Sequence, residues 1–109
     1  MAKSLEYQIV ARALEIISDE ARWTKAVVAR KADGRCCEFA NPLAAQFCAV
    51  GALSRAAYEL LGARGVESTL KAVKFVLAAD NRPPDSLPLI NDQEGHAAIV
   101  ALFKRALAS

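Results

Sequence analysis

The sequence predicts a mainly α-helical fold, or an α+β fold if a β-hairpin forms near residues 25–39. Apolar residues recur every three or four positions in four segments, as they do along one face of a helix. Glycine and proline gather between these segments, where they end helices. One stretch lacks helical spacing and contains Asp33-Gly34, a favoured hairpin turn pair. We therefore expect a compact bundle of about four helices around a central helix, 42–61.

Length and composition fit a single globular domain over residues 1–109. The 109 residues are 54% hydrophobic and 24% charged, and no apolar run is long enough to span a bilayer. The N-terminus lacks the pattern of a secretory signal, so we expect a cytoplasmic protein without a membrane partner. The net charge is +2, and basic and acidic side chains alternate between residues 19 and 38, which argues against a nucleic-acid partner.

The first helix is expected over residues 5–18, with Ser4 as its N-cap. In residues 25–39, Val27 and Val28 precede the Asp33-Gly34 turn, and we interpret the stretch as a hairpin rather than a loop. The three cysteines of the chain are too few for a disulfide framework, so we expect reduced thiols.

The second helix, 42–61, is predicted to begin after Asn41 as N-cap, with Pro42 at its first position. This start places Cys48 about two turns inside the helix. Gly51 would weaken a helix interior, so we interpret it as the site of a close approach by another element. Bulky and small residues separate onto two faces. The bulky face holds Leu43, Phe47, Val50, Ala57 and Leu61, and the small face holds Ala45, Ala49, Ala52 and Ala56.

A third helix is expected over 66–79, after Gly62 and Gly65. Its predicted core stripe is Val66, Leu70, Val73 and Leu77. Phe75 points away from that stripe, beside Lys71 and Lys74. An outward phenylalanine is often incidental, but it can also anchor a partner protein, with the two lysines as the polar rim.

Residues 80–91 contain three prolines and are predicted to form a connection, held to the core by Leu87, Leu89 and Ile90. Asn91 would then cap a last helix, 92–107, with Glu94 completing a capping box. The single histidine, His96, points inward in this helix. Its predicted buried face is Ile99, Val100, Phe103, Ala106 and Leu107.

Four separated segments carry a resemblance to a known family: ARALEIISDEARWTK, ADGR, NPLAAQFCAVGALSRAA and LINDQEGHAAIVALFKRAL. They are similar to a family of small uncharacterised proteins of bacteria and their phages. Its members share a tryptophan after the first helix, a Cys-Ala-x-Gly-Ala-Leu segment, and a late Asn-Asp followed by a histidine. The resemblance covers most of the chain and implies the fold, but it implies no activity.

The sharpest chemical hypothesis is a small thiol enzyme. Cys48 would be its nucleophile and His96 the base. Asn91 or Asp92 would orient that base, although the capping of the last helix is enough to explain the presence of both residues. A cysteine deep inside a helix is poorly placed to form a thiolate. Spacing argues against a zinc site built from Cys36, Cys37, Cys48 and His96, and the sequence predicts no metal and no cofactor.

A non-enzymatic interaction module is the function that the sequence favours. It would bind a protein partner or self-associate, with Phe75, Lys71 and Lys74 as the contact candidates. The family resemblance suggests a concrete version, a phage-derived modulator of a host defence complex. The thiol enzyme and a small-ligand-binding domain, with its pocket between the hairpin and the last helix, remain the alternatives.

Overall fold

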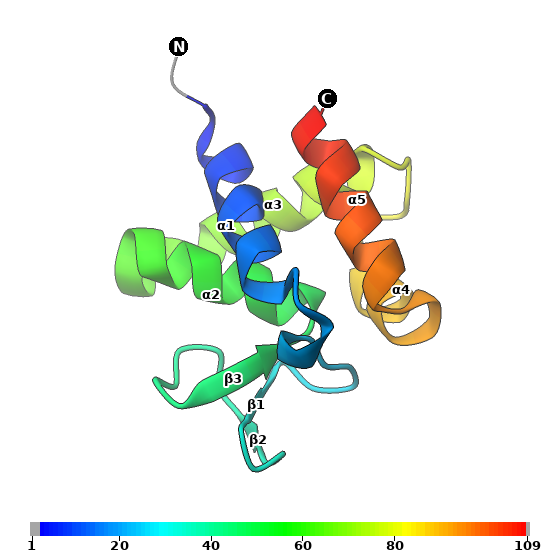
Figure 1. Ribbon diagram of the computed structural model, residues 1–109. Coiled ribbons are helices and arrows are strands. Elements are labelled where there is room, and N and C mark those ends of the chain that lie inside the picture. Colours follow the sequence, from blue (N-terminus) through cyan, green and yellow to red (C-terminus); the bar gives the residue numbers. More distant parts are fainter. Residues whose placement is uncertain (1–2, 109) are drawn as a thin grey trace.

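The computed structural model describes residues 3–108, which form five α-helices and one three-stranded antiparallel sheet. Figure 1 shows the sheet at one end of the molecule, with the helices packed together beyond it. This architecture confirms the mainly α-helical fold with a small β component. The helices are α1 Leu5–Ile17, α2 Ala49–Leu61, α3 Gly65–Ala78, α4 Leu87–Glu94 and α5 His96–Ala108, and the strands are β1 Ala29–Lys31, β2 Cys36–Cys37 and β3 Ala44–Phe47.

Helix α1 begins where the sequence predicts. The Oγ of Ser4 accepts a hydrogen bond of 3.1 Å from the backbone N–H of Tyr7, so Ser4 is the N-cap. The helix contacts α2, α3 and α5, and it shares the centre of the bundle with α2. Its buried residues are Ile9, Val10, Ala13, Ile16 and Ile17.

The predicted hairpin forms between β1 and β2, with Gly34 at a φ of 88° in its turn. A third strand, β3, pairs with the other side of β1 and gives the order β2-β1-β3. The prediction that 42–61 is one helix is therefore wrong for its first turns. Asn41 does cap backbone groups, accepting from the N–H of Leu43 at 2.8 Å, but it closes a turn before β3 rather than a helix.

Helix α2 starts at Ala49 and packs closely on the segment before β1. The backbone N–H of Cys48 donates to the carbonyl of Val28 at 3.1 Å. A Cβ on Gly51 would overlap that same carbonyl oxygen, so only glycine fits at this position without a shift of the backbone. The close approach expected for Gly51 is therefore this contact with Val28.

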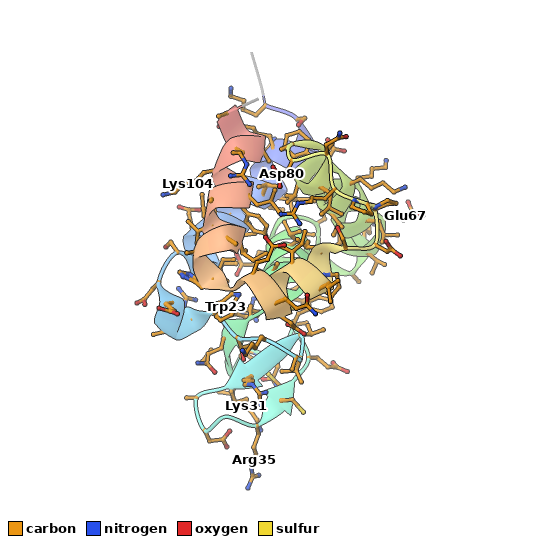
Figure 2. The ribbon with its side chains drawn as sticks, turned by 90° about the vertical axis from the view of Figure 1, so that its right-hand side faces the viewer. Trp23, Lys31, Arg35, Glu67, Asp80 and Lys104 are labelled. Carbon is orange, nitrogen blue, oxygen red and sulfur yellow. The ribbon has the colours of Figure 1, made fainter. Side chains whose placement is uncertain are left out.

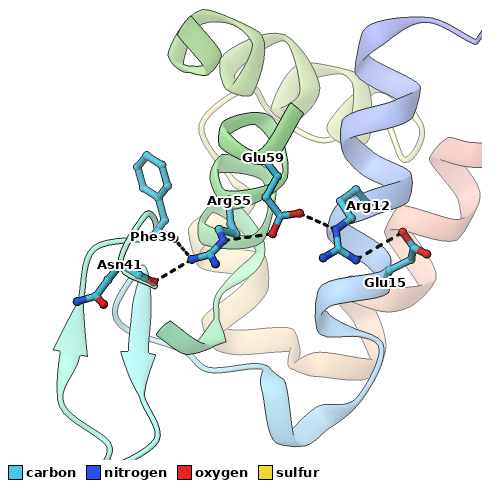
Figure 3. Close-up of polar contacts among 6 residues, drawn as sticks. All are labelled: Arg12, Glu15, Phe39, Asn41, Arg55 and Glu59. Atoms are coloured by element: carbon cyan, nitrogen blue, oxygen red, sulfur yellow. Dashed lines mark hydrogen bonds and ion pairs between the residues drawn. The ribbon is translucent and has the colours of Figure 1, made fainter. Parts of the chain in front are cut away.

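A chain of charged side chains ties α1, α2 and the β2–β3 loop together (Figure 3). Arg12 donates to Glu59 at 2.7 Å, and Glu59 also accepts from Arg55 at 3.2 Å. The guanidinium of Arg55 then donates to the carbonyls of Phe39 and Asn41, both at 2.9 Å. These bonds hold residues 39–41 in place against α2.

Helix α3 is rotated from its predicted orientation. Val66 and Leu70, two of the four residues expected in the core, are 65% and 61% exposed. Phe75 is half-buried and packs against the core, so the prediction that its side chain points outward is wrong. Lys71 and Lys74 are exposed, as expected. The residues that face the interior are Gly65, Thr69, Ala72, Val76 and Leu77.

The C-terminal part contains two helices where one was expected. Helix α4 includes Asn91, and Gly95, at a φ of 89°, separates it from α5. Asn91 therefore does not cap the last helix. Glu94 forms no capping box either, because its carboxylate binds the guanidinium of Arg82 at 2.9 and 3.0 Å.

The two C-terminal helices bury most of the residues predicted for them. Leu87 and Ile90 are buried as expected, but Leu89 is 56% exposed. In α5, Val100 and Leu107 are only partly buried, and Leu102 takes part in the core. None of the helices described over residues 3–108 combines the length and apolar character needed to cross a membrane. The buried residues of α5 are Ile99, Leu102, Phe103 and Ala106.

Candidate functional site

Three of the four candidate chemical residues line one cavity at the N-terminus of α2. Cys48, Asn91 and Asp92 are on the wall of this cavity, whose volume is about 250 Å³. His96 is not among its lining residues. The rest of the wall is apolar, and consists of Ala26, Val27, Val28, Val50 and Pro88. We call this space the Cys48 cavity.

Cys48 is the N-cap of α2 and does not lie two turns inside the helix, because the preceding residues belong to β3. Its Sγ accepts from the backbone N–H of Gly51 at 3.2 Å. Burial raises the pKa of the Cys48 thiol, and the charge of Asp92 raises it further, although the N–H of Gly51 acts in the opposite direction. The thiol is therefore protonated at neutral pH.

Asn91 joins three parts of the chain through one buried amide. Its Oδ1 accepts from the N–H of Ala49 at 2.9 Å and from Nε1 of Trp23 at 2.8 Å. Its Nδ2 donates to the carbonyl of Thr24 at 3.2 Å. Asn91 is only 1% exposed, so these bonds replace all contact with water. Asn91 thus caps the start of α2 from a distant helix, because the N–H of Ala49 has no partner within α2. The prediction had Asn91 capping the last helix instead.

Asp92 binds the backbone of Ala26, which has an unusual conformation beside the cavity. Its Oδ1 accepts from the N–H of Ala26 at 3.0 Å, and the φ of Ala26 is 74°, in the left-handed region. The N–H of Ala26 lowers the pKa of Asp92, and the amide of Asn91 lowers it further. Asp92 is exposed and ionised at neutral pH.

His96 has partners of its own. Its Nε2 lies 2.6 Å from the carbonyl oxygen of Ile17, so this nitrogen carries the proton and donates it. The ring lies 5.7 Å from the ring of Trp23, which Figure 2 places near the start of α5. Within residues 3–108, no hydrogen bond joins His96 to Cys48, so the fold builds no thiol–imidazole pair.

The described residues also hold no cluster of three or more His, Cys, Asp or Glu side chains that could bind a metal ion. Cys36 and Cys37 lie in β2 with free thiols, Cys36 exposed and Cys37 partly buried.

A larger cavity lies between α2, α3 and the β2–β3 loop. Its volume is about 490 Å³, and no charged side chain lines it. Val66, Leu70 and Tyr58 are 65%, 61% and 41% exposed at its edge. We call it the α2/α3 groove. Its walls are Phe39, Ala40, Val50, Ser54, Tyr58, Gly62, Ala63, Gly65, Val66, Thr69 and Leu70.

The outer wall of the α2/α3 groove is fixed by specific contacts. The rings of Phe39 and Tyr58 meet edge to face, with centroids 6.2 Å apart. Arg55 binds the carbonyl of Phe39, as Figure 3 shows. Sequence reasoning missed this groove because it depends on the rotation of α3, which exposes Val66 and Leu70 instead of burying them.

A family model matches residues 2–109, nearly the whole chain. The chain belongs to DUF6197, a family of unknown function. This membership agrees with the resemblance to a family of uncharacterised proteins. No curated protein and no solved structure matches this DUF6197 chain.

Proposed function

We propose that this DUF6197 chain is a non-enzymatic interaction module that binds an apolar segment of a partner protein in the α2/α3 groove. One observation carries the proposal: Val66 and Leu70 are more than half exposed at the edge of a cavity of about 490 Å³ without charged walls. Exposed apolar residues gathered at one hollow mark interaction surfaces more often than single exposed residues do.

The chemistry of the walls favours a protein segment over a small polar metabolite. Sites for such ligands place a few polar groups to fix the orientation of the ligand. In this groove the side-chain polar groups are the hydroxyls of Ser54, Tyr58 and Thr69, and that of Thr69 already donates to the carbonyl of Gly65 at 3.0 Å. An amphipathic helix supplies the matching apolar face, with two or three side chains entering the groove.

The residues at the Cys48 cavity support the non-enzymatic part of this proposal. Cys48 and Asn91 both satisfy backbone N–H groups at the start of α2, and the raised pKa of Cys48 works against nucleophilic chemistry. The resemblance to bacterial and phage proteins makes a subunit of a host defence complex one concrete partner for the groove.

A paired substitution tests the groove. Leu70→Asp places a charge in the apolar wall, where it must lose water when a partner binds. Leu89→Asp is the matched control, because Leu89 is also exposed, at 56%, but lies on α4 and outside the groove. Both variants and the unchanged protein are used as bait in bacterial lysate, after thermal melts confirm that all three are folded.

We expect one protein to be captured by the unchanged chain and by Leu89→Asp, and to be lost with Leu70→Asp. Equal capture by both variants would contradict binding in the groove. If the species lost with Leu70→Asp is a second copy of this chain, the groove is a homodimer interface and the proposal of a different partner fails.

A further inference from the structure

Ser54 is a polar residue in the middle of the α2 wall of the α2/α3 groove. Val50 lies one turn before it and Tyr58 one turn after it, so the three side chains form one stripe along the helix. Across the groove, Val66 and Leu70 of α3 are exposed at its edge. The hydroxyl of Ser54 therefore lies between an aliphatic and an aromatic side chain, and it faces a second apolar wall.

This hydroxyl forms no hydrogen bond within residues 3–108. A serine inside a helix can donate to the carbonyl four residues back, here that of Val50, but this bond is not made. Ser54 is partly exposed, and none of the described buried side-chain oxygens lacks a partner, so its Oγ keeps contact with water. The other two hydroxyls of the groove differ, because that of Thr69 is bonded to a backbone carbonyl and Tyr58 stands at the edge.

A segment that covers the stripe removes the water from the hydroxyl of Ser54. If the covering surface is apolar, this hydroxyl loses its hydrogen bonds without replacement, which weakens binding roughly tenfold or more. A hydrogen-bonding side chain at the same point of the partner replaces the lost water. An ionised side chain is unsuitable there, because no charged residue lines the groove to offset the loss of its hydration.

We infer that the segment bound in the α2/α3 groove carries one uncharged polar side chain, an amide or a hydroxyl, in the middle of its apolar face, where it pairs with Oγ of Ser54. This inference rests on the proposed function, since it describes the segment that fills the groove. Ser54 is then a specificity-determining residue. It disfavours segments with an unbroken apolar face, and the place of the polar side chain fixes how the segment lies along α2.

A displayed library of helical peptides provides the test. Its members have about 16 residues, with leucine fixed at positions i and i+11 of one face and all amino acids allowed at the two central positions, i+4 and i+7. The library is selected in parallel on the unchanged protein, on Ser54→Ala and on Ser68→Ala, after thermal melts confirm that all are folded. Ser68→Ala is the matched control, because Ser68 is also partly exposed but does not line the groove. Peptides that also bind Leu70→Asp are discarded.

We expect Asn, Gln, Ser or Thr at one central position of the peptides selected on the unchanged protein and on Ser68→Ala. On Ser54→Ala, both central positions should be apolar. Apolar or ionised residues at the central positions on all three proteins would overturn the inference and leave the proposed function standing. The same polar residue selected on Ser54→Ala would also overturn it. If no peptide depends on Leu70, the proposed function fails and the inference fails with it.

A thermodynamic cycle measures the pairing directly. Two versions of one selected peptide differ only at the polar central position, which is asparagine in one and the similarly sized leucine in the other. Calorimetric titration gives the dissociation constants of both peptides on the unchanged protein and on Ser54→Ala. We expect the ratio of the two affinities to shift roughly tenfold toward leucine on Ser54→Ala, and to stay constant on Ser68→Ala. An equal ratio on all three proteins would contradict a hydrogen bond to Ser54.

Discussion

Cys48 and Gly51 together fix the start of α2 on the backbone of Val28. The N–H of Cys48 donates to the Val28 carbonyl, and the missing side chain of Gly51 leaves room for that carbonyl. The Sγ of Cys48 in turn accepts from the N–H of Gly51. These contacts explain why both positions hold small residues, and they show that Cys48 has a structural role as the N-cap of α2.

Gly51→Ala is expected to lower the free energy of unfolding by about 1 to 3 kcal/mol, because the added Cβ must displace backbone rather than a flexible side chain. Helix propensity alone predicts the opposite, a gain of about 1 kcal/mol. Urea denaturation separates the two results. Ser54→Ala, one turn further along α2, is the control, and stabilisation by Gly51→Ala would show that no close approach exists.

The raised pKa of Cys48 predicts a loss of stability in alkaline solution. The thiolate is disfavoured in the folded state, so this group's contribution is complete below the ordinary cysteine pKa, about 9, and is lost as the pH rises toward the folded value. Cys48→Ser keeps an oxygen that can cap α2 but does not titrate in this range. Urea denaturation at several pH values should show a steeper decline above pH 9 for the unchanged protein. Parallel curves would contradict the burial of the thiol.

At the scale of elements, the amide of Asn91 connects α4 to the start of α2 and to the segment after α1. Asn91→Ala leaves the N–H of Ala49 and Nε1 of Trp23 without a partner in a site closed to water. We expect a loss of about 2 to 4 kcal/mol in urea denaturation, with a shift in the fluorescence of Trp23. Gln93→Ala, an exposed neighbour on α4, should change stability by less than about 0.5 kcal/mol. Similar losses of unfolding free energy for the two variants would contradict the capping role of Asn91.

Local signals predicted some elements and failed for others. Helix α1 and the hairpin carry their own signals, namely Ser4 with an apolar stripe and the Asp33-Gly34 turn. Strand β3, AAQF, contains no β-branched residue, and it exists because β1 offers it a free edge. Asn41 gives the same local pattern before a turn as before a helix, so the true start of α2 depends on contacts between distant segments.

The rotation of α3 has a similar cause. Two apolar stripes run along this helix, and sequence periodicity does not say which one faces the interior. The structure buries the stripe with the smaller residues, Thr69, Ala72 and Val76, and leaves Val66 and Leu70 outside. Small residues allow α3 to lie close to α2: a Cβ on Gly65 would come within 2.9 Å of the backbone of Ala57. The α2/α3 groove is a consequence of this choice.

At the scale of the whole molecule, one core joins the helices to the sheet. Phe47, at the end of β3, and Phe103, in the middle of α5, are 2% and 0% exposed. Phe47→Ala and Phe103→Ala should each lower the free energy of unfolding by about 3 to 5 kcal/mol in urea denaturation. Leu89→Ala, on an exposed site, should change it by less than about 0.5 kcal/mol. Losses below about 1 kcal/mol for both phenylalanines would contradict a shared core.

The candidate chemical residues were foreseen, but their arrangement was not. Cys48, Asn91 and Asp92 do meet at one cavity, because α4 packs against the start of α2. His96 instead binds the end of α1 through Ile17. The α2/α3 groove combines a loop and two helices, so no single segment of the sequence could reveal it.

Amide hydrogen exchange on the complex tests the central claim, that the α2/α3 groove is the surface that binds a partner. The protein is compared alone and with the partner captured by the unchanged chain. We expect slower exchange in residues 39–40, 50–58 and 62–70 when the partner is bound. Slower exchange confined to the hairpin tip, residues 31–37, or to α5, with no change around the groove, would contradict it.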